Sequence, residues 1–181
     1  MAPKLIVVSG WTGAGKSTIA DELGREFNAT VASFDWLMSG LRAFDDIWQT
    51  IELPVERQRA VGWSLLSRVA EQQLRRGSSC ILDLVARATA LPSWQSLAQQ
   101  YDASFHLIEC VCSDIAVHRS RVEGRYRAIP GWYELQWTDV ERGRQRYEPL
   151  PGLKLVLDAI NPLENNIAHA REFVSGRHSA A

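Results

Sequence analysis

The sequence predicts an α/β fold, with a five-stranded parallel sheet and helices on both of its faces. Apolar runs of strand type alternate with helical patterns along the chain, which is typical of a parallel sheet covered on both sides. No internal repeat or linker divides the 181 residues. This length suits one domain with a sizeable core, or one domain with a small mobile insert, so we expect a single domain over residues 1–181.

The expected elements follow in chain order. Five apolar runs predict strands at residues 4–8, 29–34, 79–85, 104–111 and 153–157. Helical spacing predicts helices that begin after Lys16, span 55–76 and 89–101, follow a cap at Ser113 or Asp114, span 138–147, and run from 162 to about 176. Residues 36–53 are expected to be irregular, and residues 176–181 are expected to fray.

The most informative stretch is residues 10–17, which read GWTGAGKS and match the phosphate-binding pattern G-x-x-x-x-G-K-[ST]. A strand pattern ends at the first glycine, and a helical pattern begins after the lysine, as this motif requires. The glycines permit backbone angles that let successive N–H groups wrap a phosphate at a helix N-terminus. The expected nucleotide-binding residues of the loop are Gly10, Trp11, Thr12, Gly13, Ala14, Gly15, Lys16, Ser17 and Thr18.

Two side chains of this loop carry chemistry. Lys16 would reach the β- and γ-phosphates of a nucleoside triphosphate, and the Ser17 hydroxyl would ligate Mg²⁺. The alternative, a plain strand-to-helix turn, needs neither the Lys-Ser pair nor three glycines at these offsets. The loop therefore predicts binding of a nucleoside triphosphate such as ATP, and the reaction has to be inferred from other residues.

The composition excludes several classes of function. A net charge of -1 argues against a general affinity for nucleic acid or anionic membranes. The longest apolar runs are too short to cross a bilayer, and the N-terminus lacks the apolar core of a secretion signal, so we expect a cytoplasmic protein. The cysteines, Cys80, Cys110 and Cys112, are interpreted as core residues rather than zinc ligands. The histidines are interpreted as structural or solvent-facing, with His118 next to an arginine-rich stretch.

Two acids follow expected strands, at the edge where open parallel sheets bind ligands. Asp35 follows the run 29–34, and its apolar neighbours would limit its hydration, so we interpret it as the general base that accepts the proton of an acceptor hydroxyl. Asp83 ends an apolar strand, and an acid in this position commonly holds Mg²⁺ directly or through water. We interpret Asp83 as a residue that either supports Mg²⁺ in this way or orients the acceptor. Either acid would alternatively cap the helix or turn that follows it.

Four arginines come within nine residues, at positions 119, 121, 125 and 127. Arg121 and Arg125 are one helical turn apart, so their guanidinium groups would lie on one face and clamp the transferring phosphate. We interpret these two as catalytic residues of a lid over residues 119–137. The alternative is a solvated helix with Glu123 as the salt-bridge partner, which is favoured more for Arg119 and Arg127. Three later arginines are expected at the surface: Arg142, Arg144 and Arg146.

Aromatic side chains flank both sides of the expected site. Trp36 and Trp48 lie in the segment 36–60, which we expect to bind the substrate, and Trp132 lies in the turn after the arginines. These rings would stack on a ring-bearing acceptor or on the nucleotide base, whereas packing inside the protein is the commoner role of Trp. Two further tryptophans are expected in the core: Trp63 and Trp94.

With these residues, the chain resembles the small P-loop kinases of the group that contains chloramphenicol phosphotransferase, gluconate and shikimate kinases, zeta toxins and the kinase domain of phage-type polynucleotide kinase. The resemblance covers nearly the whole chain. It implies that residues 10–17 bind ATP and that Asp35 is the base. It further implies that Asp83 is the acid after the third strand and that residues 121–125 begin the arginine-bearing lid. The implied fold is the three-layer P-loop NTPase fold with strand order 2-3-1-4-5.

The resemblance also bears on the substrates. Residues 158–164, which include Asn161, look like the segment that borders the adenine in those kinases. Met38 stands where polynucleotide kinases place an arginine, and Arg42 is the only cation of the nearby segment, so an uncharged or cationic acceptor fits better than an anionic one. The expected substrate-binding residues are Asp35, Trp36, Met38, Asp83, Arg87 and Trp132.

The sequence therefore predicts an ATP- and Mg²⁺-dependent kinase that moves the γ-phosphoryl group to a hydroxyl of a small molecule, such as an antibiotic, a sugar or a nucleoside-like compound. The expected catalytic residues are Lys16, Asp35, Arg121 and Arg125, and the expected metal ligands are Ser17 and Asp83. Two alternatives stay open: a polynucleotide 5′-hydroxyl or nucleotide kinase, and a nucleotide-dependent regulator or zeta-toxin-like protein. We expect no nucleic-acid or membrane partner, and the sequence specifies no oligomeric state.

Overall fold

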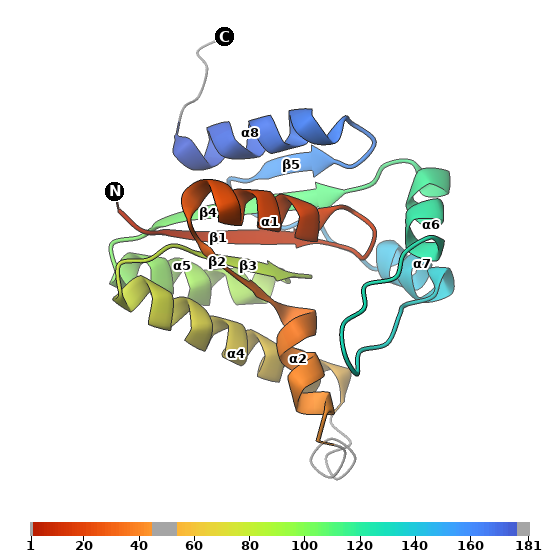
Figure 1. Ribbon diagram of the computed structural model, residues 1–181, viewed down its shortest axis with the longest axis horizontal. Coiled ribbons are helices and arrows are strands. Elements are labelled where there is room, and N and C mark those ends of the chain that lie inside the picture. Colours follow the sequence, from red (N-terminus) through yellow and green to blue (C-terminus); the bar gives the residue numbers. More distant parts are fainter. Residues whose placement is uncertain (1, 45–53, 177–181) are drawn as a thin grey trace.

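The computed structural model describes residues 2–44 and 54–176 of the chain. Five parallel strands form one sheet in the order β2-β3-β1-β4-β5, with β1 at its centre (Figure 1). The strands are β1 (Lys4–Gly10), β2 (Thr30–Ser33), β3 (Cys80–Leu84), β4 (Ser104–Val111) and β5 (Leu155–Asp158). This order confirms the strand order that the resemblance implied.

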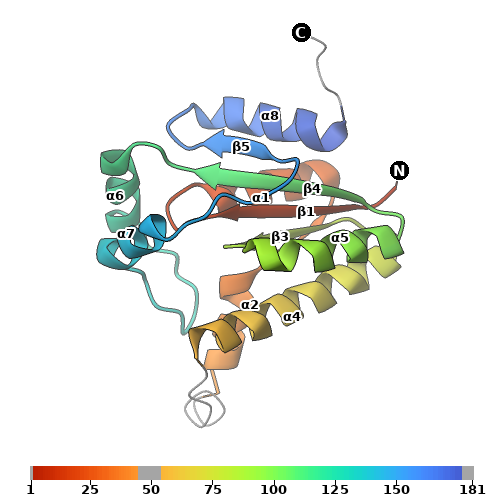
Figure 2. The same cartoon turned by 180° about the vertical axis from the view of Figure 1, so that it is seen from behind.

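Helices cover both faces of the sheet, which confirms the three-layer α/β prediction. The helices are α1 (Lys16–Phe27), α2 (Phe34–Arg42), α4 (Val55–Arg75), α5 (Leu91–Gln100, preceded by the 3₁₀ turn η1, Ala88–Ala90), α6 (Ile115–Glu123), α7 (Trp137–Gln145) and α8 (Leu163–Ser175). Helices α1 and α8 lie on one face, and α4 and α5 lie on the other (Figures 1 and 2). Within the described ranges, no helix is both long enough and apolar enough to cross a membrane.

The core lies on both sides of β1. Leu5 and Val7 belong to a buried cluster with residues of α4 and α5, whereas Ile6 and Val8 belong to a cluster with residues of α1 and α8. The alternation arises because successive side chains of a strand point to opposite faces of the sheet. All four side chains are fully buried, so the end of β1, where the glycine-rich loop begins, is held firmly from both sides. As expected, the three cysteines are buried, and they are free thiols.

The segment after β2 differs from the prediction. Residues 34–42 form the helix α2 rather than an irregular stretch, and β2 ends at Ser33. Phe34, Leu37 and Met38 have the i, i+3, i+4 spacing of a helix face, and they pack toward the core. Asp35 therefore lies in the first turn of α2 instead of following a strand directly. The remainder of the stretch expected to be irregular, residues 45–53 with Trp48, lies outside the described residues.

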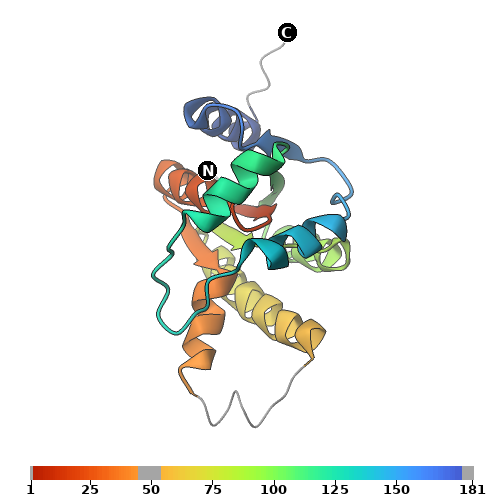
Figure 3. The same ribbon diagram turned by 90° about the vertical axis from the view of Figure 1, so that its right-hand side faces the viewer.

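Helices α6 and α7 lie beyond the carboxyl ends of the strands, and the loop 124–136 between them runs alongside α2 (Figures 1 and 3). The Asp114 side chain caps the start of α6, as expected. The helix ends before Gly124, so Arg121 lies in α6 but Arg125 lies in the loop. The prediction that both arginines share one helical face is therefore wrong.

Candidate active site

The loop between β1 and α1 has the backbone shape that a phosphate-binding loop needs. Gly13 and Gly15 have φ angles of 88° and 83°, in the left-handed region that side chains disfavour. They turn the chain so that α1 begins at Lys16, and the first N–H groups of a helix are available to an anion. The loop borders a cavity of about 330 Å³, the phosphate cavity, which is lined by Gly13, Gly15, Lys16, Ser17, Thr18, Arg121 and Arg125.

A second cavity, of about 250 Å³, adjoins the phosphate cavity and shares Gly15, Thr18 and Arg121 with it. Its other walls come from the glycine-rich loop, α1, β4, β5, the chain after β5 and α8, and they include Ala14, Cys110, Leu157, Ala159, Asn161 and Asn166. Nη2 of Arg121 donates a hydrogen bond to the backbone oxygen of Ala159 at 2.8 Å. Arg121 therefore links the lid to the segment that contains Asn161.

Lys16 and Asp83 form a buried ion pair at the centre of the site. The Nζ atom of Lys16 lies 3.7 Å from Oδ1 of Asp83, and the two side chains are 8% and 5% exposed. Asp83 lies in β3 beside Val8 of β1, so the sheet register sets it next to the glycine-rich loop. Oδ1 of Asp83 is buried and accepts no hydrogen bond from any described residue. A buried carboxylate oxygen of this kind, with the Ser17 hydroxyl nearby, fits a Mg²⁺ ion that takes its other ligands from phosphates and water.

A cavity of about 300 Å³, the central cavity, brings together acids and arginines from distant parts of the chain. Its charged and hydroxyl-bearing walls are Ser17, Asp21, Ser33, Asp35, Asp83, Arg125 and Arg127. Trp36 also borders it, with 55% of its surface exposed. Asp21 is a residue that the sequence reasoning missed, although it lies one helical turn after Ser17. Burial, and secondly the charge of Asp83, raise the pKa of Asp21 above its usual value.

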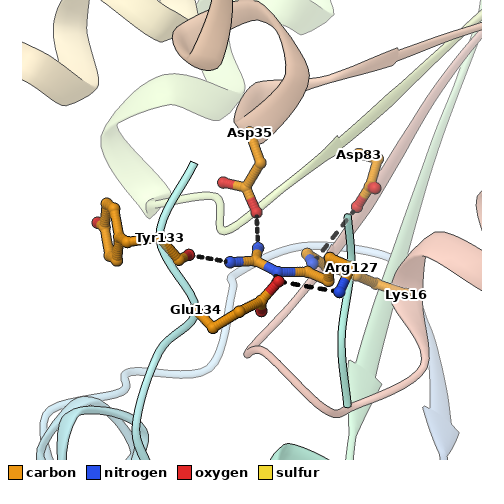
Figure 4. Close-up of polar contacts among 6 residues, drawn as sticks. All are labelled: Lys16, Asp35, Asp83, Arg127, Tyr133 and Glu134. Atoms are coloured by element: carbon orange, nitrogen blue, oxygen red, sulfur yellow. Dashed lines mark hydrogen bonds and ion pairs between the residues drawn. The ribbon is translucent and has the colours of Figure 1, made fainter. Parts of the chain in front are cut away.

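Arg127 connects the lid to α2, and Figure 4 shows its contacts. Its Nη1 atom donates to Oδ2 of Asp35 at 2.5 Å, its Nε atom donates to Glu134 at 2.9 Å, and its Nη2 atom donates to the backbone oxygen of Tyr133 at 2.6 Å. Only 6% of the Arg127 side chain is exposed. The interpretation of Arg127 as a solvated arginine is therefore wrong, because an acid from α2 and an acid of its own loop enclose its charge.

Burial and the contacts of Arg127 also shift the pKa values of two neighbouring lid residues, Arg125 and Glu134. Burial, and secondly the charge of Arg127, lower the pKa of Arg125 below its usual value. Burial would raise the pKa of Glu134, but hydrogen bonds from the backbone and side chain of Arg127 outweigh it and lower that pKa. Arg125 borders both the phosphate cavity and the central cavity, so it is the lid arginine with access to both.

A fourth cavity, of about 180 Å³, lies on the other side of Lys16 and is mostly apolar. We call it the apolar cavity. Met38, Asp35, Asp83, Arg87 and Trp132, which were all expected to bind the substrate, line it. Its remaining described walls are Trp11, Thr12, Lys16, Ser33, Phe34, Val55, Gln58, Arg59, Trp63, Leu84, Val85, Tyr133 and Leu135. Five of the six expected substrate residues thus surround one space, whereas Trp36 borders the central cavity instead.

The profile of the AAA_33 family, described as an AAA domain, matches residues 5–150, which is most of the chain and includes the glycine-rich loop. The chain belongs to this AAA domain family. A comparison with curated proteins gave no significant match.

Solved structures agree with this assignment at the level of the fold. An unliganded sugar kinase from a Janibacter species is 18% identical, with a TM-score of 0.69 over 96% of this chain and 95% of that one. A gluconokinase from Sinorhizobium meliloti is 13% identical, with a TM-score of 0.67 over 97% of this chain and 93% of that one. The adenosine phosphosulfate (APS) kinase CysC of Mycobacterium tuberculosis, solved with AMPPNP and APS, is 17% identical, with a TM-score of 0.62 over 96% of this chain and 98% of that one.

In this AAA domain, a buried histidine of α6 hydrogen-bonds to the backbone of the glycine-rich loop. His118 of α6 is 2% exposed, and its Nε2 atom lies 2.7 Å from the backbone oxygen of Thr12. Its Nδ1 atom lies 2.7 Å from Nη1 of Arg144, which also donates to the backbone oxygen of Cys112. Arginine only donates, so Nδ1 accepts and Nε2 carries the proton that it donates to Thr12. The structural interpretation of His118 agrees with this role, but the expectation of a surface position for Arg144 is wrong.

Trp11 joins the glycine-rich loop to α7. Its ring lies edge-on to Tyr147, with the ring centroids 6.1 Å apart. A β-carbon at Gly143 of α7 would lie 2.4 Å from the ring, so only glycine allows this approach. At the start of the loop, a β-carbon at Gly10 would lie 2.3 Å from the backbone oxygen of Cys110. Trp11 and Gly10 therefore pack the loop against its surroundings, and Trp11 is absent from the described walls of the phosphate cavity.

Two residues whose roles the sequence reasoning missed have a partner far away in the chain. Arg127 contacts Asp35 across 92 positions, and His118 contacts Thr12 across 106 positions. The four-residue spacing of Asp21 from Ser17 was a usable local signal. For Arg127, Glu134 and Arg144, no local pattern separates a buried pair from the exposed pairs common on helices, such as Arg119 with Glu123.

Proposed function

We propose that this AAA domain is a kinase that transfers the γ-phosphoryl group of ATP, with Mg²⁺, to a hydroxyl of a small molecule. The observation that carries the proposal is the pair of cavities on either side of Lys16. Lys16 lines both the phosphate cavity and the apolar cavity, and Asp83 beside it lines both the apolar cavity and the central cavity. A nucleotide switch needs only the first of these spaces, whereas a transferase needs room for an acceptor next to the phosphates.

The binding of ATP would use the residues around the phosphate cavity. The loop amides and Lys16 would hold the β- and γ-phosphates, and the cavity that contains Asn161 would take the base. Arg121 and Arg125 line the phosphate cavity from the lid, where positive charge would stabilise the negative charge of the transferring group. One of the structures with a similar fold is a kinase that was solved with AMPPNP, and this supports the nucleotide assignment.

Ser17 and Asp83 would hold the magnesium ion. Mg²⁺ held there would supply positive charge that neutralises part of the negative charge of the phosphates. Lys16 would then pair with the phosphates instead of with Asp83, and the buried oxygen of Asp83 would gain a partner. The described residues include no cluster of three His, Cys, Asp or Glu side chains that is positioned for a metal ion, so the phosphates and water would complete the coordination.

Asp35 would accept the proton of the acceptor hydroxyl. Asp35 lines both the apolar cavity and the central cavity. The hydroxyl of an acceptor bound in the apolar cavity would therefore lie beside Asp35 and point toward the phosphates of ATP. Arg127 hydrogen-bonds to Oδ2 of Asp35, which orients the carboxylate and leaves Oδ1 to take the proton. Arg127 thus acts as a positioning residue, because it fixes Asp35 and the lid loop together.

The substitution Asp35→Asn tests the proposal. An amide cannot accept the proton, so transfer should fall by about 10²-fold or more, while the Kd for ATP should change by less than about twofold. The matched control is Asp102→Asn, an exposed residue whose φ of 50° suits asparagine equally well. Transfer is measured as acceptor-stimulated ADP release, and ATP binding is measured by calorimetry.

Two results would overturn the proposal. If Asp35→Asn kept full acceptor-stimulated ADP release, Asp35 would not be the base. If the wild-type protein bound ATP but stimulated no phosphoryl transfer to any hydroxyl compound, a nucleotide-dependent regulator would be the better interpretation. A salt-sensitive phosphorylation of a 5′-hydroxyl oligonucleotide would instead favour the polynucleotide kinase alternative.

A further inference from the structure

We propose that the acceptor is a largely apolar, ring-bearing alcohol rather than a sugar, a sugar acid or a nucleotide. This inference rests on the proposed kinase function and narrows its substrate class. It is carried by the walls of the apolar cavity, which combine rings and aliphatic side chains from α2, α4, the end of β3 and the lid. These walls include Phe34, Met38, Trp63, Leu84, Trp132 and Leu135. The sequence places these residues up to about 100 positions apart, and only the fold assembles them around one space.

The polar groups of this cavity are mostly committed to the phosphoryl side. Lys16 also lines the phosphate cavity, and Ser33, Asp35 and Asp83 also line the central cavity. Of the remaining polar side chains, Gln58 already has a partner, and Arg59 pairs with Glu56 on α4, whereas the buried Nε1 atom of Trp11 has no hydrogen-bond partner among the described residues. A sugar carries several hydroxyl groups, and each one left without a partner in a dry cavity is unfavourable. The few available groups can satisfy one reacting hydroxyl far better than a polyol.

The cations of the region argue against an acceptor that carries phosphate. Lys16 faces Asp83, Arg59 faces Glu56, and Arg127 is enclosed by Asp35 and Glu134. Arg87 is the one arginine of the cavity wall with no ion pair to a described residue. A dianionic phosphate group is usually recognised by a cluster of arginines, and a single half-buried arginine beside two acids is a poor match for it.

The ring of Trp132 in the lid is held in place by two neighbouring side chains, Tyr133 and Arg42. Trp132 stacks on Tyr133 with the ring centroids 5.0 Å apart and an interplanar angle of 29°. The guanidinium of Arg42 on α2 lies 4.9 Å from the centroid of Trp132 and 4.6 Å from that of Tyr133. Arg42, the only cation that the sequence has in residues 36–48, is therefore engaged with the lid rings. These contacts fix Trp132 as one wall of the cavity before any acceptor binds, and a fixed ring lowers the entropic cost of stacking.

The test compares ring alcohols with polar acceptors on the full chain with ATP and Mg²⁺. The ring alcohols are 2-phenylethanol and 2-naphthylmethanol, and the polar acceptors are glucose, gluconate and a nucleoside 5′-monophosphate. We expect kcat/KM to be at least about tenfold higher for the ring alcohols, because their ring surface is removed from water. Binding of 2-naphthylmethanol without ATP is measured separately by calorimetry.

Variants connect the preference to the cavity. Trp132→Ala should raise the KM for the ring alcohols by about tenfold and leave the Kd for ATP unchanged. Leu135→Asp, at a half-buried lid position, should give the same selective loss if Trp132→Ala disturbs the lid as a whole. The matched control is Tyr126→Ala, which removes a lid ring that is 83% exposed and is not among the cavity walls. The control should keep the wild-type preference.

Each outcome bears on a separate claim. If glucose, gluconate or the monophosphate is the better acceptor, the ring-alcohol inference is overturned, while the kinase function stands. If no acceptor is phosphorylated but 2-naphthylmethanol still binds and Trp132→Ala weakens that binding, the inference about the cavity holds and the kinase function fails. If no ring alcohol binds or reacts, the inference is overturned.

Discussion

The two sides of Lys16 are built in different ways. On the phosphate side, the walls come mostly from one continuous stretch, the loop and first turn of α1, which is anchored by the fully buried β1. On the acceptor side, the walls come from α2, α4, β3 and the lid, and ion pairs and stacked rings hold them together. The first arrangement depends on backbone geometry, and the second depends on side-chain contacts between distant segments.

This difference indicates which residues could be substituted to change the acceptor without losing the binding of phosphates. A backbone loop binds phosphates through N–H groups that every residue supplies, so its requirements are glycines and one lysine. The proposed acceptor side would recognise its ligand through side chains, so substitutions there would change the acceptor without changing the fold.

The largest effect is expected on the phosphate side. Lys16→Met removes the charge that would contact the β- and γ-phosphates, so we expect transfer to fall by about 10³-fold and ATP binding to weaken. Acceptor-stimulated ADP release measures the first change and calorimetry with ATP measures the second. Circular dichroism controls for folding. Unchanged transfer in a folded variant would break the comparison, because the loop would then not serve the reaction.

A smaller and more selective effect is expected for the contact that joins the two sides. Arg127→Gln removes the ion pairs to Asp35 and Glu134, so the lid and α2 should lose their common support. We expect the KM of the acceptor to rise by about tenfold, while the Kd for ATP changes by less than about twofold. Steady-state kinetics and calorimetry give the two values.

The matched control for this experiment is Arg119→Gln. Arg119 lies in the same arginine-rich stretch, but its side chain is 58% exposed and pairs with the exposed Glu123. This variant should behave like the wild type. If Arg127→Gln weakened ATP binding as much as acceptor binding, the prediction would be contradicted, because Arg127 would then support the phosphate side as well as the acceptor side.

The packing of the loop against α7 gives a third prediction. Gly143→Ala places a β-carbon 2.4 Å from the Trp11 ring, which must move, so we expect the free energy of unfolding to fall by about 1–2 kcal/mol. The matched control is Gly40→Ala in α2, where the new β-carbon has no atom of the described residues within 4 Å apart from its chain neighbours and the adjacent backbone of the helix. Alanine favours helices over glycine, so this control should be stabilised by about 0.5–1 kcal/mol. Urea unfolding measures both, and equal changes in the two variants would contradict the prediction.

The smallest effect is expected from the half-buried His106 and the buried His118 as the pH falls. Burial, and secondly the charge of Lys4, lower the pKa of His106 to about 4, and burial is also the main cause that lowers the pKa of His118. The unfolded chain therefore binds more protons than the folded one below about pH 6.5, so the free energy of unfolding should decrease from pH 6.5 toward pH 4. Allowing for the partial exposure of His106, we expect a loss of about 1 kcal/mol between pH 7 and pH 5.

The dependence of stability on pH is checked by urea unfolding at several pH values. His118→Asn should reduce the dependence of the free energy of unfolding on pH. Asparagine takes up no proton, whereas protonation of His118 would remove the Nδ1 lone pair that accepts the hydrogen bond from Arg144. His169→Asn, at an exposed position of α8, should keep the wild-type slope. An unchanged slope in His118→Asn would mean that the histidine supports the loop without titrating in this range.

The fold and the phosphate side could be predicted because their signals are local. The alternation of strands and helices gave the parallel sheet, and the spacing of Gly13, Gly15 and Lys16 gave the loop. Helix α2 was missed, although Phe34, Leu37 and Met38 have helical spacing, because aromatic residues next to a strand end fit either interpretation. The roles of the individual site residues stay predictions, although the structure brings most of them around connected cavities.

The sequence by itself determined the strand–loop–helix unit at residues 4–27 and the residue types that surround the phosphate cavity. Backbone angles and hydrophobic periodicity act over a few residues, so a short stretch specifies them completely. Only the tertiary structure decided that Arg127 meets Asp35, that His118 donates to Thr12, and that Trp132 faces the rings of α2 and α4. These contacts depend on how far each side chain is buried and on which charge lies opposite, and such properties exist only after the sheet has brought distant segments together.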